Sequence, residues 1–161
     1  MKAIVAMCRN RVIGINDKLP WPPIKEDFKW FKEFTINKTI VIGKKTFDSL
    51  PKLKDRNCIV VIKPQPELSH IKNQSFINNN GMISKMMLFE EIINLPNNSE
   101  LIIAGGAKTY SKFLPYITEF YVTHVNGDYP GNIHMPHFEH LFTNKEVVKE
   151  FDLHKVIKYS K

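Results

Sequence analysis

Short runs of aliphatic residues, separated by segments with helical periodicity, constrain the fold of this chain more than any other feature. The runs cover residues 2–8 (KAIVAMC), 39–43 (TIVIG), 58–62 (CIVVI) and 100–104 (ELIIA). Such runs, apolar on both faces, are typical of strands buried in a parallel sheet. Helical segments are expected at residues 24–35, 44–50, 88–95 and 107–114. The alternation of strands and helices predicts an α/β fold with a largely parallel sheet.

The C-terminal part of the chain follows a different pattern. Residues 119–125, 144–151 and 155–159 resemble strands with few helices between them, which is typical of antiparallel neighbours. The stretch 64–81 contains Asn-Asn-Asn-Gly at its end and is expected to be mostly loop and turn. No repeat and no linker divides the 161 residues. We therefore expect a single domain over residues 1–161, an α/β sandwich whose mixed sheet is closed by a C-terminal antiparallel hairpin.

The charge balance indicates an anionic partner. Lysine and arginine number 23 against 16 acidic residues, which gives a net charge of +7. Nucleic acid is one such partner, but the basic residues are scattered and only Arg9, Arg11 and Arg56 are arginines, the side chain that nucleic-acid readers use most. A basic nucleic-acid-binding α/β domain therefore remains only the non-enzyme alternative, and a small anionic molecule is favoured.

The cellular setting is predicted from what the sequence contains. Cys8 and Cys58 lie in apolar runs, so we expect buried free thiols in a reducing cytoplasm. No cysteine–histidine cluster has the spacing of zinc ligands, so no metal is expected. No apolar run approaches the roughly 20 residues of a membrane helix, and the N-terminus does not resemble a signal peptide. The predicted location is the cytoplasm, without a membrane partner.

Asp27 is an acidic residue in the middle of an apolar helix face. On a helical wheel it lies between Phe31 and Phe34, whereas its neighbour Glu26 points to the charged side. A carboxylate in apolar surroundings is costly without a partner, which suggests the floor of a ligand pocket. The alternative is a helix cap, because Pro22 and Pro23 precede the helix and an aspartate in the first turn complements the helix dipole.

Two strands of the predicted sheet run through glycine into helices that begin with lysine. TIVIG is followed by KKTFDSL, and ELIIA by GGAKTYSKFL. Lysines such as Lys44, Lys45 and Lys108 are unfavourable at a helix N-terminus unless an anion lies there. The segments match neither the dinucleotide motif nor the triphosphate motif. Exposed lysines with turn glycines explain each segment equally well alone, but the pair favours a ligand with several phosphates.

Three segments together resemble dihydrofolate reductases of the small monomeric kind found in bacteria and animals. They are RVIGINDKLPWPPIKEDFKWFK, with its Leu-Pro-Trp and following acid; NKTIVIGKKTFDSLPKLKDRNCIVV, with its Gly-Lys-x-Thr-Phe and later Arg-Asn; and IIAGGAKTYSKFLPYITEFYVTHVNGDYPGNIHMP, with its Gly-Gly and Thr-His. They follow the family's order and span most of the chain. The resemblance implies a mostly parallel, eight-stranded mixed sheet flanked by helices, with an antiparallel C-terminal strand.

The resemblance also implies an activity, the reduction of 7,8-dihydrofolate to tetrahydrofolate by NADPH. Asp27 occupies the position of the family's active-site acid, which pairs with the pterin 2-amino group and the adjacent ring nitrogen. Whether the proton comes from water or through the carboxylate stays open. Antifolate inhibitors are implied as further ligands, nucleic acid is not required, and a monomer is expected. The runner-up enzyme is a reductase of riboflavin synthesis with a related fold, against which the Leu-Pro-Trp loop, Asp27 and Arg56 argue.

The roles of the substrate-site residues are carried over by position. Thr123 would hydrogen-bond Asp27, Trp21 would hold an ordered water near the pterin, and Arg56 would bind the glutamate α-carboxylate of folate. A core indole and the β-propensity of threonine are the plainer explanations of Trp21 and Thr123. Core packing explains the apolar walls equally well without the resemblance. These walls would be formed by Ile4, Val5, Ala6, Phe28, Phe31, Leu50 and Leu53.

The cofactor groove is likewise implied by position, and the Gly105–Gly106 bond is expected to be cis. Tyr110 would also border the nicotinamide, so it joins Asp27, Trp21 and Thr123 as a candidate catalytic residue. Lysines 44, 63 and 108 would face the adenosine 2′-phosphate. The cofactor positions are Ala6, Ile13, Gly14, Leu19, Gly43, Lys44, Lys45, Thr46, Lys63, Ala104, Gly105, Gly106, Ala107, Lys108, Thr109 and Tyr110.

Two positions depart from the family pattern. Ala104 stands before the double glycine, where larger apolar residues are common, so apolar contact beside the pterin and nicotinamide is reduced. Asn132 stands where many bacterial relatives have an aspartate that accepts backbone N–H bonds from the loop covering the nicotinamide, here residues 14–19. An asparagine oxygen accepts such bonds without the assistance of a charge.

Overall fold

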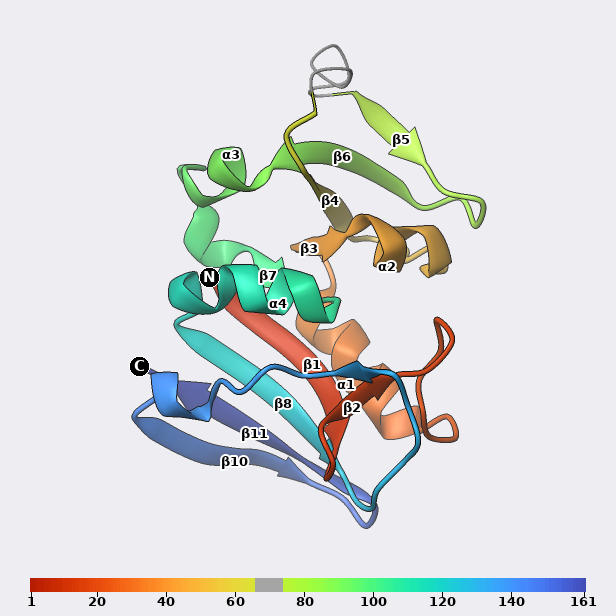
Figure 1. The fold of residues 1–161 in the computed structure, drawn as a ribbon, viewed down its shortest axis with the longest axis vertical. Coiled ribbons are helices and arrows are strands. Elements are labelled where there is room, and N and C mark those ends of the chain that lie inside the picture. Colours follow the sequence, from red (N-terminus) through yellow and green to blue (C-terminus); the bar gives the residue numbers. More distant parts are fainter. Residues whose placement is uncertain (66–73) are drawn as a thin grey trace.

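Among the described residues, a twisted sheet of nine strands forms the centre of the molecule, in the order β10-β11-β8-β1-β7-β3-β4-β6-β5 (Figure 1). The structure is a computed structural model that describes residues 1–65 and 74–161. The strands of this sheet are β1 (Lys2–Cys8), β3 (Thr39–Gly43), β4 (Asn57–Ile62), β5 (Ser75–Ile77), β6 (Ile83–Leu88), β7 (Ile102–Ile103), β8 (Glu119–Val125), β10 (Asn144–Glu150) and β11 (His154–Ser160). A separate ribbon pairs β2 (Val12–Gly14) with β9 (Ile133–His134).

The strands from β8 to β6 run parallel, and both ends of the sheet are antiparallel. β11 pairs antiparallel with β8 and β10, and β5 pairs antiparallel with β6. The predicted α/β class, the mostly parallel mixed sheet and the C-terminal hairpin are therefore confirmed. The strand number differs from the eight that the resemblance implies, because the short edge strand β5 adds one.

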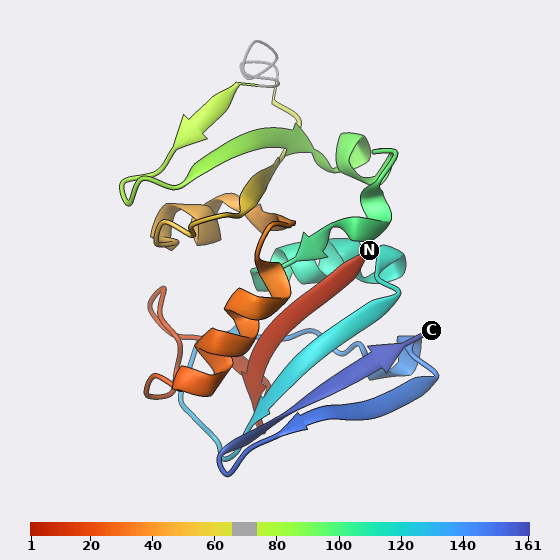
Figure 2. The same ribbon diagram turned by 180° about the vertical axis from the view of Figure 1, so that it is seen from behind.

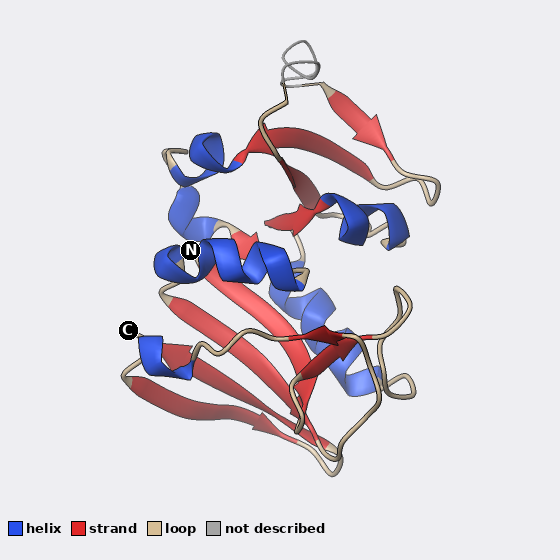
Figure 3. Cartoon of the chain, viewed as in Figure 1, coloured by secondary structure: helices blue, strands red, loops and turns tan. Residues whose placement is uncertain are grey.

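Helices cover both faces of the sheet (Figure 3). They are α1 (Lys25–Thr35), α2 (Lys44–Ser49), α3 (Phe89–Ile93) and α4 (Ala107–Phe113), with 3-10 turns η2 (Asn98–Glu100), η3 (Leu114–Tyr116) and η4 (Glu139–Leu141). α4 lies over one face of the central strands in Figure 1. Seen from behind, α1 crosses the opposite face along β1 (Figure 2).

The residues between β4 and β7 differ most from the sequence predictions. The loop expected at 64–81 contains β5, and its part 66–73 lies outside the described residues. β6 was not predicted because its polarity is inverted: Ser84 is buried, whereas Ile83 is exposed. The helix expected at 88–95 covers only Phe89–Ile93, since Leu88 still belongs to β6. The strand expected at 100–104 covers only Ile102–Ile103, and Glu100 belongs to η2.

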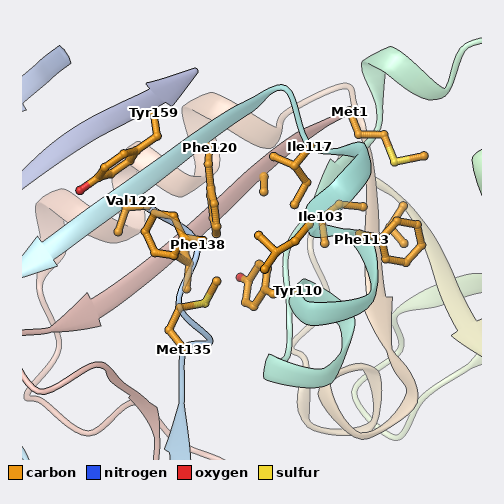
Figure 4. Packing of buried hydrophobic residues seen from close by; sticks show 14 of the residues in the cluster. Met1, Ile103, Tyr110, Phe113, Ile117, Phe120, Val122, Met135, Phe138 and Tyr159 are labelled. Atoms are coloured by element: carbon orange, nitrogen blue, oxygen red, sulfur yellow. The ribbon is translucent and has the colours of Figure 1, made fainter. Parts of the chain in front are cut away.

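The sheet separates two apolar clusters. On the α4 face, Tyr110 and Phe113 pack with the side chains of alternate strand positions such as Val5 and Val122, and with Phe138 (Figure 4). On the α1 face, Ile4, Ile40, Ile42 and Ile102 pack with Trp30, Phe31 and Phe34. Burial of a large apolar side chain stabilises the fold by about 1.5–3 kcal/mol, so these clusters fix α1 and α4 against the sheet. Cys8 and Cys58 are buried free thiols, as expected.

Candidate active site

Asp27 lies in the first turn of α1, on the side that faces the sheet. It is 9% exposed, and it shares the interior face of the helix with Thr35. Ile24 precedes the helix with extended backbone and no side-chain cap, so Asp27 is not the capping residue. The part of the alternative that makes Asp27 the helix cap is therefore wrong. Asp27 still complements the dipole of α1, as any acid in a first turn does.

The surroundings of Asp27 act on its proton in opposite directions. Burial raises the pKa of the Asp27 carboxyl, and this is the largest effect. A hydrogen bond from Thr123 and the electrostatic interaction with His154 oppose it and lower the pKa. The net result is a pKa above the usual range, because the cost of removing a carboxylate from water exceeds what the two partners return. The predicted contact between Asp27 and Thr123 is present.

Strand register places Thr123 beneath α1. Thr123 pairs with Ala6 of β1 on one side and with Val156 of β11 on the other. Side chains alternate along a strand, so Thr123 shares its face with these partners and not with the flanking Val122. Thr123 is 1% exposed, so its hydroxyl has few alternatives to the Asp27 carboxylate.

The structure brings most of the expected apolar walls together. Phe31, Leu50, Leu53 and Ala104 are half-buried and pack against one cluster that contains Ile4. Phe28 is 51% exposed on the same helix as Asp27. An open apolar surface beside a buried carboxylate is a suitable surface for a flat ring that carries N–H donors. Val5 differs, because its side chain packs in the cluster on the opposite face, so only its backbone faces this site.

Two expected polar residues hold nitrogen atoms without a partner among the residues that the structure describes. They are Nε1 of Trp21 and both Nε and Nη1 of Arg56. Trp21 is 4% exposed and packs edge-to-face on Tyr129, with ring centroids 6.1 Å apart. Buried N–H donors are normally satisfied, because an unmade hydrogen bond costs about 1–3 kcal/mol. These donors therefore fit a ligand that carries acceptor oxygens.

The carboxyl ends of β7, β3 and β4 meet at one edge of the sheet. The three strands are neighbours and run parallel. This edge is where ligands bind in open α/β sheets. The residues that directly follow these strands are Ala104, Lys44 and Lys63, so the structure brings these three predicted cofactor positions to one edge. The Gly43 N–H donates to the Gly105 carbonyl (2.9 Å), which ties the two loops at this edge.

Close packing at this edge depends on glycine. A Cβ atom at Gly43 would lie 2.8 Å from Oγ1 of Thr109, and one at Gly106 would lie 3.2 Å from Oγ1 of Thr46. The Gly105–Gly106 peptide bond is cis, as expected. Glycine at these positions lets the hydroxyls of Thr46 in α2 and Thr109 in α4 lie close to the backbone at this edge, which forms the glycine cradle of the site.

Several charged and aromatic side chains at this edge form contacts within the protein that the sequence did not predict. Lys44 forms an ion pair with Asp48, and Lys45 pairs with Asp17 at 3.2 Å. Lys63 and Lys108 are exposed. Tyr110 is buried, and its hydroxyl donates to the Ile4 carbonyl at 2.6 Å. Burial raises the pKa of Tyr110 far above its usual value, so the hydroxyl acts as a fixed donor that holds β1 against α4.

The loop of residues 14–19 is a tight turn that faces this edge (Figure 1). Ile15 and Lys18 exchange both backbone hydrogen bonds at 2.9 Å, with Asn16 and Asp17 in the left-handed region between them. This is the geometry of a two-residue hairpin turn. The pairing of Asp17 with Lys45 on α2 joins the loop to the cofactor edge. Ile13, Gly14 and Leu19 thus lie on an element that borders the site.

Sequence reasoning missed His154. It lies 2% exposed at the start of β11, close enough to influence the Asp27 proton. The only signal was a histidine at the start of a strand that otherwise contains mainly lysine and apolar residues. Among the described residues no group of three potential metal ligands gathers, and none of the described helices is long and apolar enough to cross a membrane.

Comparisons with known proteins show the family of the chain. Residues 1–159 match the family model described as dihydrofolate reductase. The chain is 36% identical to the dihydrofolate reductase of Buchnera aphidicola subsp. Acyrthosiphon pisum, over 84% of this chain and 78% of that protein. It is 32% identical to the dihydrofolate reductase type 8 of Escherichia coli, over 100% and 95%.

A solved structure, dihydrofolate reductase from Enterococcus faecalis complexed with NADP(H) and RAB-propyl, shares the fold. The TM-score is 0.76 at 24% identity, covering 99% of this chain and 94% of that one. The family model over residues 1–159 therefore puts the chain in the class of NADPH-dependent oxidoreductases. Within it, the chain belongs to the dihydrofolate reductase family. Membership favours neither the riboflavin-pathway reductase nor the nucleic-acid-binding domain.

Proposed function

We propose that this chain catalyses the reduction of 7,8-dihydrofolate to 5,6,7,8-tetrahydrofolate with NADPH. The observation that carries the proposal is Asp27, a buried carboxylate beside open apolar surface in a chain of the dihydrofolate reductase family. A carboxylate in that position offers two oxygens to two N–H donors of a flat ring, which fixes the orientation of the ring. The pterin of dihydrofolate carries such donors on its 2-amino group and ring nitrogen.

The cofactor's residues are those at the carboxyl ends of β3, β4 and β7. When bound there, NADPH supplies the hydride. Lys44, Lys63 and Lys108 offer positive charge to its phosphates. Thr46 and the glycine cradle let the protein backbone approach those phosphates closely. The hydrogen bond from the Tyr110 hydroxyl to the Ile4 carbonyl keeps the β1 backbone fixed at the place where the nicotinamide and pterin rings would meet. The loop at 14–19 excludes water from that place.

Asp27 raises the proton affinity of the bound pterin. The carboxylate favours a cationic ring beside it, so the proton that accompanies hydride transfer is bound more readily. The hydride adds to the ring carbon of the C=N bond and the proton to its nitrogen, so one proton is consumed for each NADPH oxidised. Trp21 and Thr123 assist this step by positioning other groups. The indole N–H of Trp21 holds a water near the pterin, and the Thr123 hydroxyl fixes the Asp27 carboxylate.

Arg56 is proposed to bind the α-carboxylate of the substrate's glutamate. Its guanidinium holds Nε and Nη1 without a partner among the described residues, and Leu50 and Leu53, which precede it in the sequence, pack in the apolar wall. A guanidinium fork matches a carboxylate at two points. The same walls would accept antifolate inhibitors, and the molecule is proposed to act as a monomer in the cytoplasm, without nucleic acid or membrane.

The direct test is the loss of absorbance at 340 nm when purified protein is mixed with NADPH and dihydrofolate. We expect oxidation of NADPH that depends on both compounds and is much slower with NADH. Dihydrofolate should be replaced in a parallel reaction by a pyrimidine intermediate of riboflavin synthesis. Oxidation with that compound alone, or with neither, would overturn the proposal.

A further inference from the structure

The turn between β5 and β6 contains a buried asparagine. This turn is the Asn-Asn-Asn-Gly segment of the sequence, and its first residue is Asn78. Asn78 is 8% exposed, whereas Asn79 and Asn80 are exposed. Burial of an amide is costly unless its donors and acceptors find partners. The partners of Asn78 therefore indicate what the buried side chain does.

The amide of Asn78 uses its oxygen and its nitrogen for different purposes. Its Oδ1 accepts the backbone N–H groups of Asn80 at 3.0 Å and of Met82 at 2.9 Å, which closes the turn. Its Nδ2 donates out of the turn to the carbonyls of Phe47 (2.5 Å) and Leu50 (2.8 Å). An aspartate would close the turn equally well, but it has no such donors. The asparagine therefore points to its contacts with the second segment.

The carbonyls that accept these bonds belong to the C-terminal end of α2. A helix leaves its last four carbonyls without partners inside the helix, and α2 has only six residues, so it is weak on its own. Asn80 adds a second amide donor to the Leu50 carbonyl, at 3.1 Å. Figure 1 shows the turn of the β5–β6 hairpin beside this end of α2. The turn therefore caps α2 from outside the helix.

Segment 50–53, which follows α2, has no regular structure and contributes to the expected apolar wall. Leu50 and Leu53 of this segment pack in that wall, and the Leu53 N–H donates to Sδ of Met82 at 3.4 Å. A cavity of about 240 Å³ lies between α2 and β5, with Phe47 and Asn78 among its walls. Packing against β5 is thus incomplete on this side of α2. The hydrogen bonds from the turn fix what the packing leaves free.

We propose that Asn78 is a positioning residue, through which the β5–β6 turn sets the place of segment 50–53 and the tightness of substrate binding. The inference rests on the proposed function, since it assumes that this wall holds dihydrofolate. A ligand that needs the segment in one position binds with an apparent Kd that rises as the population of that position falls. The start of α2 is held separately, because the Gly43 N–H donates to the Gly105 carbonyl. Loss of Asn78 should therefore weaken the binding of dihydrofolate more than that of NADPH.

The binding test compares Asn78→Ala and Asn80→Ala with the wild type. Dissociation constants for dihydrofolate and for NADPH are measured separately, from the quenching of tryptophan fluorescence. We expect Asn78→Ala to raise the Kd for dihydrofolate by roughly three- to tenfold and the Kd for NADPH by less. Asn80→Ala removes one donor from the Leu50 carbonyl, so it should produce a smaller change in the same direction.

Two results would overturn the proposal. One is an unchanged Kd for dihydrofolate in folded Asn78→Ala, and the other is an equal increase for both ligands. If Asn78→Ala does not fold, the exposed Asn80 decides the question, and an unchanged Kd for dihydrofolate in Asn80→Ala then overturns the proposal.

The matched control is Asn98→Ala. Asn98 is half-buried, and its Nδ2 donates at 2.5 Å to the carbonyl of Ile93, the last residue of α3. The arrangement repeats the one at α2, but none of the candidate site residues belongs to α3. We expect this variant to lose thermal stability without a change in either Kd. An increase for dihydrofolate equal to that of Asn78→Ala would show a general effect of losing a helix cap and overturn the specific role.

A second measurement needs no ligand. Exchange of backbone amide hydrogens is followed by NMR in the wild type and in the same variants. The amides of Leu50 and Leu53 both donate hydrogen bonds, so they report on the segment. We expect them to exchange faster in the two turn variants but not in Asn98→Ala, and unchanged exchange overturns the inference. Faster exchange supports the positioning role even where the wild type fails to bind or reduce dihydrofolate, a failure that would defeat the proposed function alone.

Discussion

At the scale of single residues, the site is defined by the cost of keeping Asp27 where it lies. Burial raises its pKa, and the two partners that oppose this effect, Thr123 and His154, come from strands that pair with each other. A carboxylate placed in this way is a poor choice for stability and a good one for binding a cationic ring. Under the proposed function, the unpartnered nitrogens of Arg56 and Trp21 are binding groups by the same reasoning.

The free-energy cost of burying the Asp27 carboxylate can be measured as a pH-dependent difference in stability between the wild type and Asp27→Asn. The folded-state pKa of Asp27 is raised, so the wild type loses stability as pH rises from the ordinary carboxyl pKa of about 3.9 through the folded value. The free energy of unfolding of Asp27→Asn, measured with urea, should exceed that of the wild type at pH 7, with the gain shrinking on acidification.

Asp128→Asn is the opposite control for this prediction. Asp128 is exposed, and its hydrogen bond with Arg9 lowers its pKa. Its substitution should therefore bring no gain at pH 7. A wild type that is more stable than Asp27→Asn at neutral pH would contradict the account of a costly carboxylate.

Ala104→Ile tests the apolar wall. Ala104 is half-buried beside Ile4 and Ile102, and its N–H donates to the Val41 carbonyl at 2.9 Å. A larger side chain should extend the wall toward the ligand and tighten diaminopyrimidine inhibitors, by about 0.8 kcal/mol for each methylene that packs without strain. The dissociation constant is measured by fluorescence titration, with thermal unfolding as a check on strain. Weaker binding at unchanged thermal stability would mean that neighbouring residues already fill the space.

At the scale of elements, the cofactor site is a meeting of strand ends rather than a single motif. β7, β3 and β4 each end at the same edge, and each is followed by a lysine within a few residues. The ion pair between Asp17 and Lys45 joins the loop at 14–19 to this edge. The loop also follows β2, which pairs with β9. Under the proposed function, recognition of phosphate and coverage of the nicotinamide would therefore depend on neighbouring elements.

The double variant Lys44→Ala with Lys108→Ala should distinguish NADPH from NADH. Each exposed ion pair contributes roughly 0.2–1 kcal/mol, so the KM for NADPH should rise several-fold while that for NADH stays nearly constant. Lys44 already pairs with Asp48, which reduces its share. Steady-state kinetics with both cofactors measure the effect, and Lys29→Ala with Lys32→Ala on α1 is the charge-matched control. Equal changes for both cofactors would contradict a role at the 2′-phosphate.

Asn132→Asp tests the latch of the loop. The Asn132 N–H already donates to the Gly14 carbonyl at 3.2 Å, and a Cβ on Gly131 would lie 2.1 Å from Cγ1 of Val12. An added carboxylate would accept loop N–H groups with the assistance of its charge, so the closed form gains and hydride transfer should become a few-fold faster at most. Stopped-flow single turnovers measure the rate, with Asn126→Asp as control. Unchanged rates and unchanged NADPH affinity would argue against a latch here.

At the scale of the whole molecule, the sequence predicted the features that depend on local pattern. Uninterrupted apolar runs such as TIVIG and CIVVI identified the buried parallel strands, and the acid on an apolar arc identified Asp27. β6 escaped prediction because Ser84 faces inward and Ile83 outward, an inversion that only tertiary packing explains. His154 escaped for a related reason: its neighbours in space come from β8 and α1, which are distant in sequence.

The site residues also divide into those that a local sequence pattern predicts and those whose role depends on tertiary contacts. The lysine-bearing helix starts were visible as local motifs, but the ion pairs that engage Lys44 and Lys45 were not, since they depend on side-chain reach across a turn or between elements. Val5 shows that the site positions of a family cannot be transferred to this chain as one continuous stretch. It alternates with Ile4 along β1, so its side chain packs on the opposite face of the sheet.

The most direct test of the central claim is single-turnover hydride transfer by Asp27→Asn. The change keeps the shape and removes the charge, so the fold and NADPH affinity should be retained. The rate at pH 7 should fall by about 10²–10⁴-fold, the usual contribution of positioned proton-transfer chemistry. The loss should shrink at low pH, where dihydrofolate arrives protonated from solvent. Near-normal turnover of this variant at pH 7 would contradict the account, because Asp27 would then have no part in the chemistry.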